Sequence, residues 1–202
     1  MGILKGAVTV RRYRVDGAPP EGFRAYFPEC LQAFAFTDPA SKTSKQERSG
    51  WVLMRNLLDT DFHDLDALLV TDTYAAFQLR VDRKALPAKL FKAHLEKRIE
   101  AWCDEHGREH APRGVKDELK EQLEFEWLAR ALPRVQTTEV TWHLTDGYVL
   151  FHSLSTQAND RFRKLFLQTF GLRLVPHNPL DMLIDSLADE LASTGSTDLR
   201  LA

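Results

Sequence analysis

Hydrophobic residues in the middle of the chain recur first with a helical period and then with the period of a strand. Over Leu86–Trp102 and Val115–Ala131 they lie three or four residues apart, which predicts two helices that each carry one narrow apolar stripe. The other positions are mostly charged, so the helices are expected to pack on each other as a projecting hairpin. A basic connector, Leu132-Pro133-Arg134, leads into a predicted strand–turn–strand over Thr138–Phe151 that turns at Asp146-Gly147.

The same patterns predict the elements on either side of the hairpin. Together they indicate an α+β fold in which antiparallel sheets are flanked by helices. One domain is expected over residues 1–192, with the hairpin at 84–134 and a flexible tail at 193–202. The order of elements before and after the hairpin also suggests an internal pseudo-repeat. The predicted elements are a strand at 3–15, a helix at Glu21–Phe34, an exposed loop at Asp38–Gly50, strands at Trp51–Met54, Leu65–Thr71 and Tyr74–Val81, a helix at Gln157–Phe170 capped by Ser155 or Thr156 and ended by Gly171, a strand at Leu172–Val175 and an amphipathic helix at Leu180–Ala192.

Composition narrows the class of protein. The 202 residues are 44% hydrophobic and 28% charged, as in an ordinary soluble globular protein. No apolar run is long enough to span a bilayer, residues 1–30 lack a signal peptide's apolar core, and Cys30 and Cys103 are read as free thiols. A cytoplasmic location is therefore expected. The formal net charge of −2 argues against a uniformly basic binder but allows a local basic surface.

Basic residues are the strongest candidate chemistry. Duplex DNA requires spaced cations that neutralise phosphates and does not require base contacts. The alternative is a solvated helix face on which each cation pairs with a nearby glutamate, and the pattern alone favours this alternative. The clusters are Arg11, Arg12 and Arg14 on the first strand, Lys84, Lys89 and Lys92 before and within the first helix, and Lys116, Lys120, Arg130 and Arg134 along the second helix and its exit.

Three other groups of residues allow a chemical and a structural interpretation. The acidic run Asp59, Asp61, His63, Asp64 and Asp66 could hold the metal of a nuclease, but adjacent acids more often form a polar turn. His106 and His110 have the spacing of a zinc pair, yet Gly107 interrupts the helix that this pair needs. Trp142, Tyr148 and Phe151 could stack on bases, although a core role is favoured. No nucleophile elbow or phosphate-binding glycine loop is present, and no cofactor or metal is expected.

Several short motifs, taken in order, resemble the family of the bacterial recombination-associated protein RdgC. The resemblance covers roughly residues 3–182, and it rests on the order and spacing of the motifs together. The motifs are Arg12–Arg14, Phe34-Ala35-Phe36-Thr37, Gly50-Trp51-Val52, Leu86-Pro87, Lys116-Asp117-Glu118-Leu119, Leu128-x-Arg130-Ala131-x-x-Arg134, Thr138, Trp142…Asp146-Gly147 and Leu174-Val175-Pro176…Asn178-Pro179.

The resemblance implies a DNA-binding protein without catalysis. Members of the family bind duplex DNA with little sequence preference, form a ring-shaped dimer around it and restrain the RecA recombinase. It also implies a shortened member, because typical relatives continue beyond the region of Asp181, and Leu132 stands where they tend to carry an aromatic residue at the ring-closing contact. By position, the residues expected to contact phosphates are Arg12, Arg14, Lys89, Lys116, Arg130 and Arg134, and the basic pattern adds Lys120.

The leading hypothesis is therefore a sequence-independent, double-stranded DNA-binding protein. It would be a homodimer, associated with the nucleoid, that modulates homologous recombination or replication as a ring-like or clamp-like assembly and limits recombinase access. The alternatives are a protein-interaction module without DNA binding and, less favoured, a metal-dependent nuclease that uses the Asp59–Asp66 run.

Overall fold

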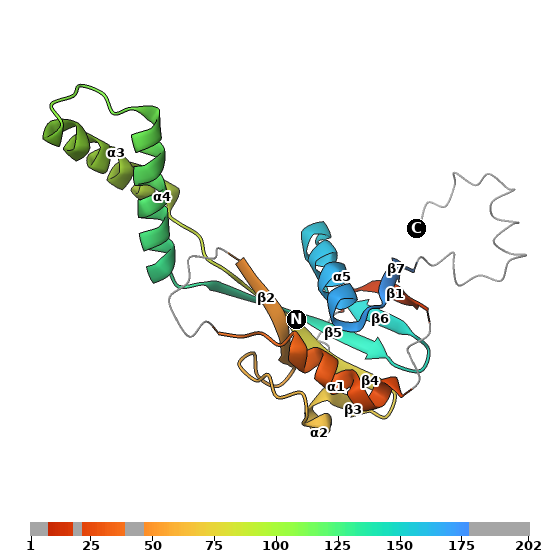
Figure 1. Cartoon of the computed structure of the whole chain (residues 1–202). Coiled ribbons are helices and arrows are strands. Elements are labelled where there is room, and N and C mark those ends of the chain that lie inside the picture. The colour runs from red at the N-terminus through yellow and green to blue at the C-terminus, as the bar shows by residue number, and fades with distance from the viewer. Residues whose placement is uncertain (1–7, 18–21, 39–46, 178–202) are drawn as a thin grey trace, which may run out of the picture.

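The computed structural model describes residues 8–17, 22–38 and 47–177, which form one antiparallel sheet with helices around it (Figure 1). Within these ranges there are seven strands and five helices, and the strand order is β2-β4-β5-β6-β1-β7 with β3 paired to β4. This arrangement confirms the α+β class. The elements are β1 (Arg11–Asp16), α1 (Phe23–Ala33), β2 (Glu47–Leu53), α2 (Leu65–Leu68), β3 (Leu69–Thr71), β4 (Tyr74–Arg83), α3 (Ala88–Glu105), α4 (Arg113–Arg130), β5 (Arg134–His143), β6 (Tyr148–Phe151), α5 (Thr156–Phe170) and β7 (Arg173–Pro176).

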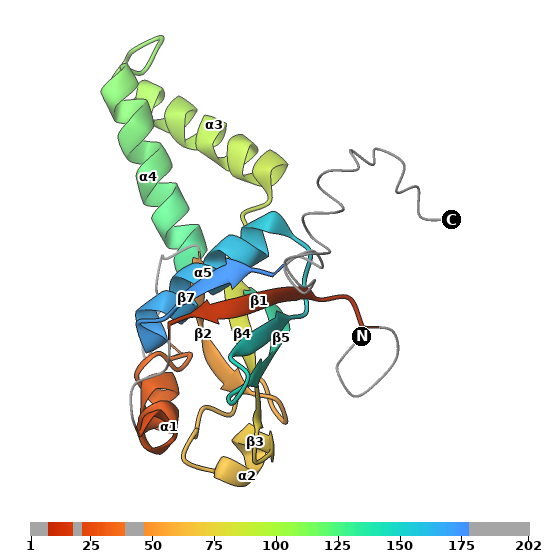
Figure 2. The ribbon, with the colours of Figure 1, turned by 90° about the vertical axis from the view of Figure 1, so that its right-hand side faces the viewer.

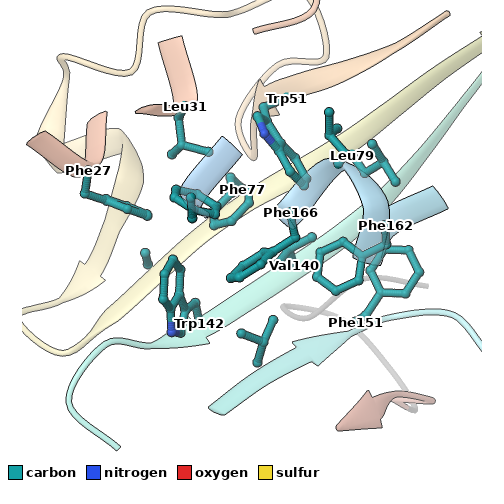
Figure 3. Close-up of a cluster of buried hydrophobic side chains, with 14 of the residues drawn as sticks. Phe27, Leu31, Trp51, Phe77, Leu79, Val140, Trp142, Phe151, Phe162 and Phe166 are labelled. Carbon is teal, nitrogen blue, oxygen red and sulfur yellow. The ribbon is translucent and has the colours of Figure 1, made fainter. Parts of the chain in front are cut away.

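The core lies between one face of the sheet and the helices α1 and α5 (Figure 3). Aromatic rings fill most of it: Phe151 of β6 stacks on Phe162 of α5 with centroids 4.3 Å apart, and Trp142 of β5 contacts both helices. Because each fully buried large apolar side chain contributes about 2 kcal/mol, these contacts fix α5 on the sheet. A buried polar contact also joins α5 to the sheet, since Trp51 Nε1 donates to Thr169 Oγ1 over 2.8 Å.

The helices α3 and α4 are an insertion between two neighbouring strands, and they stand away from the sheet (Figures 1 and 2). The strands β4 and β5 pair over ten residues, from Tyr74 opposite His143 to Arg83 opposite Arg134, and the hairpin leaves from this last pair. The two helices meet through Phe91 and Trp127, whose ring centroids are 5.7 Å apart, as the apolar stripes predict. The root of the hairpin is therefore held by a long antiparallel ladder.

Three predicted elements differ from the structure. The segment Leu65–Thr71, predicted as one strand, begins as helix α2, because the Asp64 carboxylate accepts a hydrogen bond from the Ala67 amide and caps that turn. Of the predicted loop Asp38–Gly50, residues Glu47–Gly50 belong to β2, where they pair with the end of β4. The strand predicted to begin at Thr138, after a connector that included Arg134, begins at Arg134 as β5, because residues 134–137 pair with the end of β4. In all three places the structure depends on local capping or distant pairing, which hydrophobic periodicity does not report.

The helix α5 agrees closely with its prediction. Ser155 is the N-cap, with its hydroxyl accepting from the Ala158 amide, and Gly171 ends the helix in the left-handed conformation. The first strand begins at Arg11 in the described part of the chain. Residues 3–7, the predicted helix Leu180–Ala192 and the tail 193–202 lie outside the described residues. The internal pseudo-repeat stays a prediction, and β1 of the first half pairs with β6 and β7 of the second.

Candidate nucleic-acid interface

Cationic side chains gather where the hairpin joins the sheet. The register places Arg83 of β4 directly opposite Arg134 of β5, and both are exposed. A groove of about 420 Å³ lies beside them, and Arg83, Lys84 and Lys120 all line it. Arg130 is in the last turn of α4, four residues before Arg134. We call Arg83, Lys84, Lys120, Arg130 and Arg134 the hairpin-base cluster.

Lys84 has a positioning role in this cluster. Its ammonium group donates a hydrogen bond of 2.6 Å to the carbonyl oxygen of Leu128, in the last turn of α4. A cation is favourable there because the carbonyl groups at a helix C-terminus carry partial negative charge. Lys84 thereby ties the end of β4 to the end of α4 and fixes the direction in which the hairpin leaves the sheet.

The groove also contains the carboxylate of Glu124, and three of the other cations have no ion-pair partner among the described residues. Arg83, Lys120 and Arg134 form no ion pair with another described residue. Elsewhere on the hairpin, cations pair with nearby glutamates: Lys92 lies 3.7 Å from Glu96, and Arg98 binds Glu126 at 2.6 Å. The Arg98 hydrogen bond lowers the pKa of the Glu126 carboxyl. The middle of the hairpin is therefore paired, whereas Arg83, Lys120 and Arg134 form no ion pair with another described residue.

Lys89 and Lys116 lie near the cluster without being part of the groove. Lys89 is the second residue of α3, directly after Ala88, which lines the groove. Lys116 is one helical turn before Lys120 on α4. Both side chains are exposed. The structure therefore brings most of the predicted site residues to one region.

Arg12 and Arg14 are the exception. They lie on β1, which is separated from β5 by β6. The Arg12 guanidinium sits 4.4 Å from the centre of the Tyr148 ring, which stacks on His143 from its own hairpin. The hydroxyls of Tyr148 and Tyr74 are 2.5 Å apart, and this contact, together with burial, raises the pKa of Tyr148 to about 12. Arg12 therefore belongs to an aromatic cluster on the sheet, whereas Arg14 is an exposed cation beside it.

The acidic run has structural roles. The Asp59 and Asp61 carboxylates accept hydrogen bonds from the amides of Asp61 and His63, and Asp64 caps α2. In residues 8–17, 22–38 and 47–177, no group of three or more His, Cys, Asp or Glu side chains is placed to hold a metal ion. These carboxylates organise a polar turn, as the structural interpretation predicts.

The histidine pair is divided in the structure, and two of the three aromatic residues are buried. His106 follows the end of α3 and stacks on Trp102 at 4.1 Å, so it does not share a helix with His110. Trp142 and Phe151 are fully buried in the core. Of the three aromatic candidates for base stacking, Tyr148 alone reaches the surface in part.

Arg83 is not among the site residues that the sequence predicts. It lies in the last position of β4, and its importance comes from its pairing with Arg134 across the ladder. The signal that could have found it is the equal length of β4 and β5, ten residues each, which places the two ends of the hairpin side by side.

Comparison with known protein families gives a match over most of the chain. The model of the family described as "Putative exonuclease, RdgC" matches residues 11–194 of the 202-residue chain. The match spans the whole described sheet, the hairpin and α5. Among the described helices, none combines the length and apolar character that a membrane span needs. By the extent of this match, the chain belongs to the RdgC family of recombination-associated proteins.

Proposed function

We propose that this protein binds double-stranded DNA without sequence preference and does so without catalysis. The observation that carries the proposal is the hairpin-base cluster, in which Arg83 and Arg134 are adjacent, exposed and without an ion pair among the described residues. Two like charges side by side destabilise a ladder, and an anion bound between Arg83 and Arg134 would relieve that repulsion, which Glu47 on the other side of Arg83 offsets only in part. A phosphate backbone supplies such anions at regular spacing.

The biological role we propose is to limit the access of a recombinase to DNA during homologous recombination or replication. A homodimer would do this as a ring-like or clamp-like assembly, bound electrostatically and associated with the nucleoid. Two exposed apolar side chains support the dimer: Leu132 is 90% exposed beside Arg134, and Phe125 on α4 is 61% exposed. Burial of these two side chains against a second copy would be favourable.

The charge reversal Arg83→Glu with Arg134→Glu tests DNA binding. It replaces one like-charge pair with another at exposed positions, so the fold should survive. We expect Kd for a duplex of about 20 bp to rise at least about 100-fold at about 50 mM salt, equally for unrelated sequences, and the slope of log Kd against log salt to fall by about two. Fluorescence anisotropy measures both.

The matched control is Arg108→Glu with Arg113→Glu, which makes the same charge change at the tip of the same hairpin. An equal loss in this control, or binding by the wild type that salt does not weaken, would reject the proposed interface. Incubating the labelled duplex with the protein and Mg²⁺ or Mn²⁺ addresses the nuclease alternative, because shortened products would show catalysis.

The dimer has its own test at Leu132. We expect Leu132→Ser to convert a dimer of the 23.1 kDa chain to a monomer, because it removes the exposed apolar side chain at the proposed contact. Light scattering with and without a duplex measures the mass. Leu58→Ser is the control, since Leu58 is also exposed but lies in the loop before α2. A wild-type protein that stays monomeric on DNA would contradict the clamp.

A further inference from the structure

A second groove lies between α5 and β7, which are side by side in the fold (Figure 2). Its volume is about 390 Å³, and both charged and apolar side chains line it. Leu167 is apolar, yet it is 45% exposed there. The lining residues are Asp160, Arg163, Lys164, Leu167, Arg173 and Leu174, and we call this site the α5–β7 groove.

Most of the charged groups in this groove are cations. Arg163, Lys164 and Arg173 are exposed, and none of them forms an ion pair with another described residue. Asp160 also lines the groove, and Asp16 lies opposite Arg173 in the ladder. These two carboxylates offset the three cations only in part. The groove therefore favours an occupant that is acidic and carries apolar side chains.

The strand β7 forms one end of the sheet. It pairs with β1 on one side, and no other described strand pairs with it. Native proteins commonly cover such an edge with a helix or a loop, because its amide and carbonyl groups are otherwise open to another chain. A segment that fills the groove beside β7 would lie along this edge.

The chain itself continues from β7 with a segment of the required chemistry. The described part ends at His177, directly after β7, and the next residues, Asn178-Pro179, are typical of a turn. The sequence then predicts the amphipathic helix Leu180–Ala192, which would be about 20 Å long. A helix of this length is marginal in water unless its apolar side packs on another surface. Its acidic residues are Asp181, Asp185, Asp189 and Glu190.

The exit from β7 places this segment next to the groove. Figure 2 shows β7 running back along α5, so the chain leaves the strand beside the groove, and a turn there would direct the following residues along α5. We propose that residues 178–192 dock in the α5–β7 groove, with their apolar side against Leu167 and their carboxylates beside Arg163 and Lys164. The short connection to β7 gives the segment a high effective concentration at this site. The inference goes beyond DNA binding and does not depend on it.

Hydrogen exchange of residues 180–192, measured by mass spectrometry on the full chain, tests the docking. We expect these amides to exchange at least about tenfold more slowly than in a free peptide of residues 178–202, because docking protects the helix. Arg163→Glu with Lys164→Glu should remove this protection, since it replaces attraction to the carboxylates with repulsion. Both side chains are exposed, and thermal unfolding checks that α5 still packs on the sheet.

A charge exchange makes the test specific. Asp181→Lys with Asp185→Lys should also remove the protection. Combining it with the groove variant should return the exchange rate to within about threefold of the wild type, because the two sets of charges are then opposite again. The matched control, Arg108→Glu with Arg113→Glu, makes the charge change of the groove variant at the tip of the hairpin and should leave the protection unchanged.

Every other result contradicts the docking. Wild-type amides that exchange as fast as those of the free peptide would show that the segment does not dock. Protection that survives the groove variant would place the segment on another surface, and protection that grows with protein concentration would assign the groove to the segment of a second copy. A charge exchange that fails to restore protection would show that the two sets of charges do not meet. None of these measurements includes DNA, so their failure leaves the proposed function to its own test.

Discussion

Asp82→Ala is expected to lower the free energy of unfolding by about 3–5 kcal/mol, because it leaves a buried guanidinium without its counter-ion. The side chains of Arg80 and Asp82 are 6% and 8% exposed on neighbouring same-face positions of β4. They form a two-point contact, with Nε to Oδ1 and Nη2 to Oδ2 both at 2.8 Å. This contact raises the pKa of Arg80, so the guanidinium stays charged.

The other contacts of Arg80 explain why its guanidinium cannot move to water when the Asp82 carboxylate is removed. Its Nη1 donates to the Leu57 carbonyl over 3.0 Å, and its guanidinium lies 4.0 Å from the centre of the Phe36 ring. These contacts hold the cation inside the protein, with Asp38 as a weaker and exposed partner at 3.5 Å. Turning the side chain out to water would break all of them.

Urea unfolding of Asp82→Ala and of two comparison variants measures the change in the free energy of unfolding. Asp117→Ala removes an exposed partner of Arg113, and its cost should stay below about 0.5 kcal/mol. The double variant Arg80→Met with Asp82→Leu removes both charges and should recover most of the stability lost by Asp82→Ala. A double variant as unstable as Asp82→Ala would show that the cost comes from packing at Asp82 and not from the isolated charge.

The parts of the fold that sequence predicts well are those whose causes are local. Two apolar stripes, one with Phe91 and one with Trp127, predict the two hairpin helices, because helical spacing brings each stripe to one side without help from the rest of the chain. The ends of α5 are predicted for the same reason, since Ser155 and Gly171 act on their own turn. Elements that depend on distant pairing, such as the first half of β2, are missed.

The candidate site shows the same division. The sequence lists the cations but does not separate Arg12, whose guanidinium lies over Tyr148, from Arg134, which is exposed at the root of the hairpin. It also omits Arg83, whose role depends on the register of ten residue pairs. Register is set by the burial of one whole face of the sheet, so it becomes visible only when all strands are in place.

Two motifs of the family resemblance meet in space at Gly50. The segment Phe34–Thr37 runs beside β2, where the Phe36 amide donates to the Trp51 carbonyl over 2.8 Å and the Trp51 amide donates to the Phe34 carbonyl over 3.1 Å. A side chain at position 50 would place its Cβ 2.5 Å from the Phe36 Cα and 2.6 Å from the Phe36 nitrogen. Both atoms are backbone, so the glycine is required by this close approach.

Gly50→Ala is therefore expected to destabilise the protein by about 4 kcal/mol. The displaced segment would lose two backbone hydrogen bonds, at about 1 kcal/mol each. It would also withdraw the Phe36 ring from the core edge, at about 2 kcal/mol, and uncover the Arg80 guanidinium that the ring contacts. Thermal and urea unfolding measure the loss.

Gly114→Ala is the matched control, because a Cβ at that position in α4 meets no atom within 4 Å. It should be neutral or should stabilise the protein by up to about 1 kcal/mol, since alanine favours a helix over glycine. If Gly50→Ala were as mild as Gly114→Ala, the segment Phe34–Thr37 could not be pressed against β2 as described. If Gly50→Ala also reduced the additional cost of Asp82→Ala, the two sites would be coupled through Phe36, because Arg80 would already be open to water before its carboxylate is removed.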